Sequence, residues 1–556
     1  MYRLPADRPV SRVGGPASPF DRGTPEVRRA MHGLPIPTDR VRGDPGLYDG
    51  AMPSFPPRVD AARLARLSTR AAAVRGPRSA AIVHAPFTGE PIGRLPRMQH
   101  GDVREAARRA RLAQKAWAAL PAGERASVLL ALHDRLLDRI DEALDLAQLE
   151  TGKARRHAFE EVVASAVAAR YYGVRAPRLL APRRRLGVLP LVTGAVEYRR
   201  PHALVGVIVP WHAPLAFAAA HALPALAAGC AVLLEPDLQT SFTALWLAER
   251  LDEAGLPREV LQVVTGEGDD VALPLVEAVD HVAFTGRVHV GRLVAGQAGE
   301  RLVGCTVDLC GKNAILVLAD ADLDRAVAGA VRCAFAPTGP TRRSAERLLV
   351  HASVWDRFVP AFVEATRALR LGARFDFEAD VGSLLSVRHL EQVEGHVRDA
   401  VARGARVLAG GRPRPDLGPC FYEPTILEGV TEAMRCFGEV TDGPVVALSR
   451  FDSLDEAVAR ANAPPCGRAA GVWTRSVRTA RRLAARLEAS LVTVNEGHPG
   501  AWAQVGVPPG RRHDADGLLG YTETRTVTVT RGLDVDLSPR ALAALLRVVR
   551  RLPGLR

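Results

Sequence analysis

The chain has too few cysteines, in the wrong arrangement, for a disulfide scaffold or a structural zinc site. Its 556 residues include seven cysteines, scattered between positions 230 and 466. No CxxC pair and no Cys/His cluster with metal-ligand spacing occurs, so we expect no metal and a reducing, cytoplasmic location. The first residues, MYRLPADRPVSRVGG, also lack the apolar run of a secretory signal.

Aromatic residues and lysine are also scarce. Aromatics make up 5% of the chain, and lysine occurs only at positions 115, 153 and 312, whereas 71 of the 74 basic residues (74 − 3) are arginine. The net charge is +13, but no basic run is interleaved with aromatics as a nucleic-acid groove requires. The nearest candidate, Arg183–Arg185, is interpreted as a solvated turn. The composition therefore argues against a nucleic-acid partner.

One uncharged run, residues 201–234, exceeds the roughly 20 residues of a membrane helix. Prolines and histidines interrupt it, and its character changes along its length. LVGVIVP is β-branched, LAFAAAHALPALAAG is rich in alanine, and AVLLEP is again strand-like. This pattern predicts a strand, a helix and a strand of a parallel sheet buried on both faces, and not a membrane span.

The chain divides into a Pro/Gly-rich start and a long globular part. Residues 1–58 hold 11 Pro and 7 Gly without apolar periodicity, which predicts a flexible extension. From about residue 80, helical periodicity alternates with apolar runs, so we expect an α/β protein of two or three domains. Residues 531–556 are predicted to form an amphipathic C-terminal tail that packs on its own domain.

A candidate phosphate site follows the strand-like run HVAFTG. Gly286 ends this run, and Gly291 is expected to open the next helix. A glycine turn at a helix N-terminus presents free N–H groups and the positive end of the helix dipole to a phosphate. The strand ends VIVPWHAP and LLEPDLQTS lie upstream, which favours a ligand edge of a parallel sheet.

An ordered series of motifs resembles the aldehyde dehydrogenase superfamily over roughly residues 80–530, and bacterial succinate-semialdehyde dehydrogenases most of all. The series is VGVIVPWHAP, LPALAAGCAVLLEPDLQTS, EAGLPREVLQVVTG, HVAFTGRVHVGR, VDLCGKNAILVLADADLDRA, FYEPTIL, DGPVVALSRF and VTVNEG. The resemblance implies an aldehyde dehydrogenase-like α/β fold with a Rossmann-type dinucleotide-binding domain, an α/β catalytic domain and a small β oligomerisation domain. It implies NAD or NADP as the cofactor and a homo-oligomer, either a dimer or a tetramer.

On this resemblance the chain is expected to divide as follows: an extension (1–58), a dinucleotide-binding domain (59–186 and 207–307), a catalytic-type domain (308–486), oligomerisation strands (187–206 and 487–530) and a tail (531–556).

The nucleophile of the family is missing at its expected position. The family motif Asn-x-Gly-Gln-x-Cys, followed by Glu-Arg, reads Pro-Thr-Gly-Pro-Thr-Arg over residues 337–342, with Glu346 and Arg347 beyond. Gly339 and Arg347 define the register, so Arg342 occupies the position of the cysteine. A guanidinium stays protonated and has no lone pair to offer, and it cannot be the nucleophile.

Two further catalytic positions differ from the family. The oxyanion-binding Asn of the Pro-Trp-Asn motif is His212, whose imidazole can donate a hydrogen bond. The base of the Glu-Leu-Gly-Gly-Lys motif is Asp308. Its carboxylate is roughly 1.5 Å shorter in reach, and about 1 Å of misplacement can cost 10²-fold in rate.

The cofactor positions have also changed, although Trp211 is kept. The Lys that contacts the adenosine ribose is Glu235, and Leu238 stands at a usually polar contact. Glu235 would repel a 2′-phosphate, so NADP is disfavoured more than NAD. Arg287 replaces a small residue beside the pyrophosphate, where it either pairs with phosphate or blocks it. Val440 stands where a Glu holds the nicotinamide ribose, and Glu439 lies one position away. Dinucleotide binding is therefore in doubt.

Cys310 lies inside the base motif and admits two interpretations. It is either a relocated catalytic thiol or a small buried residue without a role, and the second interpretation is favoured because cysteine is among the most buried residue types. Cys333 is predicted to be a core residue.

Together these departures predict an aldehyde dehydrogenase fold whose oxidation chemistry is absent or severely impaired, a pseudoenzyme that either assembles with an active relative or holds a ligand. The alternatives are an active NAD-dependent enzyme that uses Cys310, and a thiol-independent hydrolysis assisted by His212 and Asp308.

Overall fold

The structure is a computed structural model that describes residues 58–72, 79–186, 193–309, 311–335, 344–464, 469–496 and 515–530, with single positions at 56 and between 538 and 547. Cys310, Arg342, nearly all of the predicted extension and most of the C-terminal tail lie outside the described residues.

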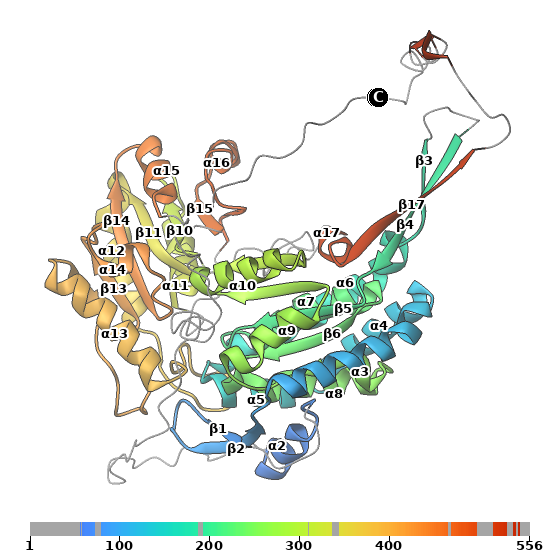
Figure 1. Cartoon of the computed structure of the whole chain (residues 1–556). Helices are drawn as coiled ribbons and strands as arrows, with labels where there is room; N and C mark the ends of the chain where they lie inside the picture. Colours follow the sequence, from blue (N-terminus) through green and yellow to red (C-terminus); the bar gives the residue numbers. More distant parts are fainter. Residues whose placement is uncertain are drawn as a thin grey trace, which may run out of the picture.

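The first half of the molecule is built on a five-stranded parallel sheet in the order β7-β6-β5-β8-β9 (Figure 1). Its strands are β5 (Leu204–Val209), β6 (Ala231–Pro236), β7 (Leu261–Val263), β8 (His281–Gly286) and β9 (Gly304–Leu309). They are connected in chain order by α7 (Pro214–Ala228), α8 (Ser241–Glu253), α9 (Ala272–Ala278) and α10 (Val288–Glu300). This arrangement confirms the predicted Rossmann-type sheet.

The uncharged run over 201–234 forms β5, α7 and β6, as predicted. Pro214 stands in the first turn of α7, where its missing N–H is not needed, and Gly229 ends the helix in the left-handed region with φ 105°. Every described side chain of α7 except Ala216 is buried, which explains why this helix lacks a polar face. No helix among the described residues is long and apolar enough to cross a bilayer.

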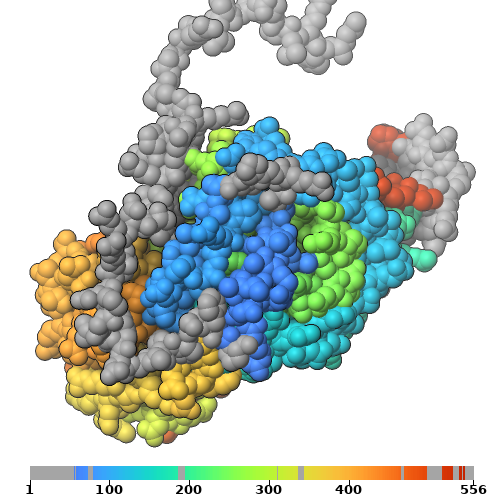
Figure 2. All heavy atoms as spheres, turned by 90° about the horizontal axis from the view of Figure 1, so that it is seen from below, coloured from blue at the N-terminus to red at the C-terminus, as the bar shows by residue number. Residues whose placement is uncertain are grey.

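An N-terminal hairpin and a set of helices pack on this sheet. They are α2 (Ala61–Ser68), β1 (Ala80–His84), β2 (Pro91–Pro96), α3 (His100–Ala119), α4 (Ala122–Asp138), α5 (Ile140–Thr151) and α6 (Arg155–Leu179). Figure 2 shows the face that they cover, in blue to cyan, beside the yellow and orange second half of the chain. Trp117 and Tyr172 are fully buried in this layer.

The second half is built on a seven-stranded sheet in the order β12-β13-β14-β11-β10-β15-β16, in which only the edge strand β12 is antiparallel. The strands are β10 (Asn313–Val317), β11 (Ala345–His351), β12 (Arg406–Ala409), β13 (Thr425–Glu428), β14 (Val445–Phe451), β15 (Ala469–Trp473) and β16 (Leu491–Val494). The helices are α11 (Leu323–Phe335), α12 (Ala352–Arg367), α13 (Val387–Ala402), α14 (Arg435–Gly438), α15 (Leu454–Asn462) and α16 (Val477–Ala484). Cys333 of α11 is a core residue, as predicted, and burial raises the pKa of its thiol to about 12.

A three-stranded antiparallel sheet projects from the first half (Figure 1). It consists of β3 (Arg183–Leu186), β4 (Thr193–Pro201) and β17 (Thr522–Thr530), the last preceded by the short helix α17 (Ala515–Leu519). Arg183–Arg185 therefore lie in a strand, and the predicted turn is wrong. The strand is possible because Glu197 of β4 neutralises charge there, pairing with Arg185 at 2.7 Å. The strand LVTV (β16) pairs with β15, not with β17.

Helices α5 and α8 are joined by a buried carboxyl group. Glu150, near the end of α5, is completely buried and accepts hydrogen bonds from the backbone N–H groups of Phe242 (2.6 Å) and Thr243 (2.7 Å) in the first turn of α8. It thus caps a helix N-terminus from a neighbouring helix. Burial raises the pKa of Glu150 to about 8, although the hydrogen bonds from Thr243 and Phe242 act in the opposite direction.

This pKa predicts how stability changes with pH. The native state keeps the proton of Glu150 up to about pH 8, whereas the unfolded chain releases it near 4.5. The contribution of Glu150 to the free energy of unfolding is therefore complete below pH 4.5. It then falls by about 1.4 kcal/mol per pH unit up to pH 8. Urea unfolding of the wild type and of Glu150→Gln across this range should show a wild-type advantage that shrinks as pH rises. A difference that does not change with pH would contradict the assignment.

Candidate functional site

The candidate site lies at the carboxyl edge of the five-stranded sheet. All five strands are parallel, so their carboxyl ends meet at one edge, and the strand order reverses direction between β5 and β8. Ligands of open α/β sheets bind in the crevice at such a switch point. His212 follows β5, Glu235 lies at the end of β6, Arg287 follows β8 and Asp308 lies at the end of β9. The structure therefore brings these four predicted site residues to one edge.

Three of these four side chains are withdrawn from solvent. Relative exposure is 2% for Glu235, 7% for His212 and 1% for Asp308. Arg287 is exposed, with 43% of its side chain accessible. Leu238, the other substituted cofactor position, is half-buried in the short 3₁₀ turn after β6.

The loop that carries His212 is held by a buried ion pair. Lys153 pairs with Glu161 of α6 and donates a hydrogen bond to the carbonyl oxygen of His212 at 2.9 Å. Glu161 in turn accepts from the backbone N–H groups of Leu215 (2.6 Å) and Ala216 (3.2 Å), the free donors of the first turn of α7. The carboxylate thus fixes both the start of the helix and the loop before it.

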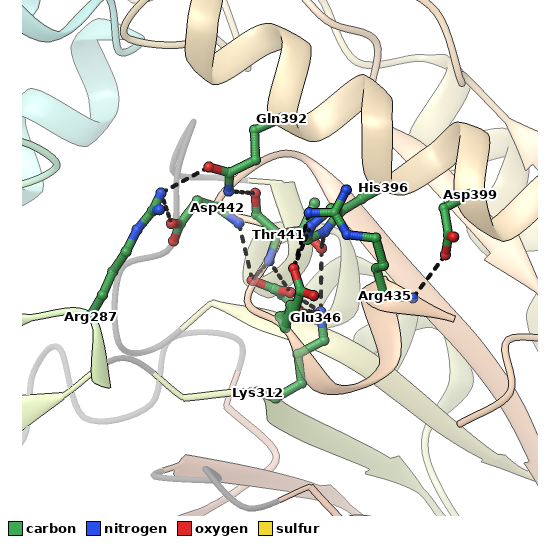
Figure 3. Close-up of polar contacts among 10 residues, drawn as sticks. Arg287, Lys312, Glu346, Gln392, His396, Asp399, Arg435, Thr441 and Asp442 are labelled. Carbon is green, nitrogen blue, oxygen red and sulfur yellow. Dashed lines mark hydrogen bonds and ion pairs between the residues drawn. The ribbon is translucent and has the colours of Figure 1, made fainter. Parts of the chain in front are cut away.

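A second buried ion pair lies in the half of the molecule built on the seven-stranded sheet. Lys312, just before β10, pairs with Glu346 of β11, and their side chains are 2% and 3% exposed. Lys312 also donates to the carbonyl oxygen of Glu439 at 2.9 Å and to Oγ1 of Thr441 at 3.3 Å. Glu346 accepts from the backbone N–H groups of Thr441 (3.0 Å) and Asp442 (3.5 Å). Figure 3 shows this network gathered under the turn before β14.

Neither ion pair was assigned a role from the sequence, but a signal for both was present. The chain has three lysines, and two of them, Lys153 and Lys312, are buried. In a chain that otherwise uses arginine, a lysine indicates a place where a compact point charge is needed.

The turn that these groups support has an unusual backbone. Asp442 has φ 63°, a left-handed conformation that non-glycine residues other than Asn and Asp seldom adopt. Besides the contact from Glu346, the ring nitrogen Nε2 of His389 donates to the carbonyl oxygen of Asp442. Burial lowers the pKa of His389 to about 4, so this ring is neutral. Trp211 packs edge-on against it, with ring centroids 4.9 Å apart.

The carboxylate of Asp442 forms an ion pair across the crevice. Nη2 of Arg287 lies 2.9 Å from Oδ2 of Asp442 and 3.1 Å from Oε1 of Gln392 on α13. Glu439, by contrast, contacts Arg435 (3.1 Å) and His396 (3.2 Å) and does not pair with Arg287. Val440 lies between Glu439 and Asp442 in the chain and is half-buried.

The glycine turn after β8 differs in one detail from its prediction. Helix α10 begins at Val288, so Gly291 does not open it. A Cβ at Gly291 would lie 2.2 Å from Cδ2 of Leu309, so the glycine lets the end of this side chain lie against α10. Gly286 does end β8, as predicted, and Arg287 is the residue that precedes the helix.

The two positions on which the chemistry depends, Cys310 and Arg342, lie outside the described residues, but their flanks are described. Arg347 is buried and donates to the carbonyl oxygens of Lys312, Arg460 and Ala461. Within the described part of the chain, no group of three His, Cys, Asp or Glu side chains could hold a metal ion.

Comparison with known proteins adds to this geometry. A family profile described as "Aldehyde dehydrogenase family" matches residues 75–527. A protein of Mycolicibacterium smegmatis named "Putative succinate-semialdehyde dehydrogenase (NADP(+))" is 43% identical over 84% of this chain and 94% of its own length. The crystal structure of succinate-semialdehyde dehydrogenase from Burkholderia pseudomallei is 30% identical, with a TM-score of 0.78 over 82% of this chain and 95% of that chain. PnpE in complex with nicotinamide adenine dinucleotide is 31% identical, with a TM-score of 0.78 over 83% of this chain and 96% of that chain.

The buried position of Glu346 predicts a large cost for its removal. Glu346→Ala would leave the Lys312 ammonium buried without its counter-charge, which typically costs ~3–5 kcal/mol in the free energy of unfolding. The matched control is Glu428→Ala on β13 of the same sheet, because Glu428 pairs with Arg406, whose side chain is 75% exposed. Loss of such a surface pair costs about 1 kcal/mol or less. Equal destabilisation of the two variants in urea unfolding would contradict the role given to Glu346.

Proposed function

The chain belongs to the aldehyde dehydrogenase family and resembles its succinate-semialdehyde dehydrogenases, and from this premise we propose that it has lost most or all of its thiol-dependent oxidation of aldehydes. The observation that carries the proposal is Arg342 at the position of the nucleophile. In the family reaction a cysteine thiolate bonds to the aldehyde carbon before hydride leaves. A protonated guanidinium cannot form that bond.

The surroundings of Arg342 support this assignment of its position. Arg347 lies near the start of β11, five residues after Arg342, and donates hydrogen bonds to three backbone carbonyl oxygens. Its neighbour Glu346 forms the buried ion pair with Lys312. Arg347, one of the two residues that define the register of the motif, is thus held in place by the core. Asp308 and His212 both reach the carboxyl edge of the sheet, but neither supplies a thiol.

We also propose that the edge holds a nicotinamide dinucleotide and favours NAD over NADP. The parallel sheet with its switch point, and the N-terminus of α10 after Gly286, suit a dinucleotide pyrophosphate. Glu235 at the end of β6 offers a carboxylate that can accept hydrogen bonds from ribose hydroxyls and repels a 2′-phosphate. The bound dinucleotide supplies a hydride acceptor. The name of the relative from Mycolicibacterium smegmatis specifies NADP(+), so this chain differs from it in cofactor preference under the proposal.

Assembly is the third part of the proposal. The three-stranded sheet projects from the body, and Tyr198, Val527 and Val529 on it are 42%, 43% and 50% exposed. These apolar groups favour a homo-oligomer, a dimer or a tetramer, or a mixed assembly with an active relative. Recovery of only the homo-oligomer on co-purification would count against the mixed form.

The loss of oxidation is tested by absorbance at 340 nm. With succinic semialdehyde and either NAD or NADP, we expect the wild type to match a heat-treated control. Arg342→Cys should form reduced cofactor. Its rate should lie about 10²-fold or more below that of an enzyme whose base is glutamate, because the carboxylate of Asp308 has a shorter reach. The matched control is Arg342→Ala, which removes the guanidinium without adding a thiol. Wild-type turnover that disappears in Cys310→Ser would overturn the proposal, because it would show that Cys310 is the nucleophile.

The cofactor preference is tested by titrating NADH and NADPH into the wild type and into Glu235→Gln. We expect the wild type to bind NADH more tightly, because the carboxylate repels the added phosphate. Glu235→Gln should reduce the ratio of the Kd for NADPH to the Kd for NADH by about tenfold, equivalent to ~1.4 kcal/mol. Tighter binding of NADPH by the wild type would contradict this part of the proposal.

A further inference from the structure

One ion pair connects the two halves of the molecule directly at the proposed cofactor crevice. Arg287 comes from the residue that precedes α10, in the half built on the five-stranded sheet. Asp442 comes from the turn between α14 and β14, in the half built on the seven-stranded sheet. Figure 3 shows Arg287 reaching across to Asp442 and Gln392. The contact therefore joins the residue after β8 to the turn before β14.

The carboxylate of this pair is held rigidly in place. Its side chain is 5% exposed, and its backbone is fixed in the left-handed region by Glu346 on one side and His389 on the other. Burial raises the pKa of Asp442, whereas Arg287 acts to lower it. A residue held in this conformation by surrounding groups persists because the structure over-determines it.

The arginine, in contrast, is half exposed and could take another partner. Both of its contacts, to Asp442 and to Gln392, use the same terminal nitrogen, Nη2. Guanidinium groups bind carboxylates and phosphates with the same planar set of donors. Arg287 stands beside the N-terminus of α10, where a phosphate is favoured. An anionic ligand that arrives there meets a cation already paired with Asp442.

We propose that Asp442 is an internal competitor for the dinucleotide: it occupies Nη2 of Arg287, and a pyrophosphate that binds through this nitrogen displaces it. This inference rests on the cofactor site proposed above. The apparent affinity for the dinucleotide is the intrinsic affinity multiplied by the fraction of molecules in which Arg287 is not paired with Asp442. The chain thus limits its own cofactor binding through a contact between its two halves, independently of the loss of the catalytic thiol.

The test uses the full chain and three variants, with NADH as the probe. Asp442→Asn removes the charge and keeps the backbone conformation, because Asn tolerates the left-handed region. Arg287→Gln removes the cation itself. The matched control is Arg156→Gln on α6. Arg156 is 40% exposed and forms a 2.7 Å ion pair with Asp380 of the second half, so it joins the same two halves at a different place.

The readout is the Kd for NADH, measured directly by titration. We expect Asp442→Asn to bind NADH about tenfold more tightly than the wild type. Arg287→Gln should show no such gain, because it also removes the cation that the pyrophosphate would use. Arg156→Gln should bind NADH as the wild type does.

The possible failures are distinguishable. If the wild type binds NADH and Asp442→Asn binds it no more tightly, the competitor role is overturned and the cofactor site stands. If no variant binds NADH or NAD at millimolar concentration, the proposed cofactor site is itself wrong, and the competitor role falls with it.

Discussion

The carboxylate of Glu346 is the contact on which the second half of the site depends. It neutralises the buried ammonium of Lys312 and accepts backbone hydrogen bonds from Thr441 and Asp442. Three segments far apart in the chain, before β10, in β11 and before β14, thereby share one buried charge. Since an isolated buried charge is expensive, these segments are stable only together. The left-handed turn at Asp442, and with it the reach of Asp442 toward Arg287, follows from that constraint.

The first half of the site depends on another buried ion pair between a lysine and a glutamate. Lys153 and Glu161 form a buried pair that holds the loop of His212 and the first turn of α7. In both halves a lysine and a glutamate, away from the proposed nucleophile position, fix the backbone that surrounds the crevice. The fold of the aldehyde dehydrogenase family is thus kept around the positions at which the sequence predicts that the side chains of the reaction have changed. Such a framework is compatible with the loss of oxidation proposed here, because folding depends on the buried pairs and not on the thiol.

Cofactor binding and catalysis are separable in this architecture. The residues that shape the dinucleotide edge are Glu235, at the end of β6, and Arg287, before α10, whereas the nucleophile position lies in the segment before β11. Under the proposals above, Arg342 accounts for the loss of oxidation, and the pair of Arg287 with Asp442 separately modulates the binding of a dinucleotide. The two proposals concern different segments of the chain and are tested independently.

The sequence alone was sufficient for the α/β fold, for the strand–helix–strand over 201–234 and for the residues that reach the sheet edge, because apolar runs and family motifs are local signals. It misassigned Arg183–Arg185, because the partner that makes a strand there, Glu197, is found only across the sheet. It assigned no role to Lys153, Glu161 or Gln392, and did not pair Arg287 with Asp442. The contacts of Arg287 with Gln392 and Asp442 join residues separated by 105 and 155 positions and depend on the relative placement of the two sheets. Local pattern determines which segments become strands and helices, whereas only the packed structure decides which charges meet, since buried charges select partners by distance and not by order in the chain.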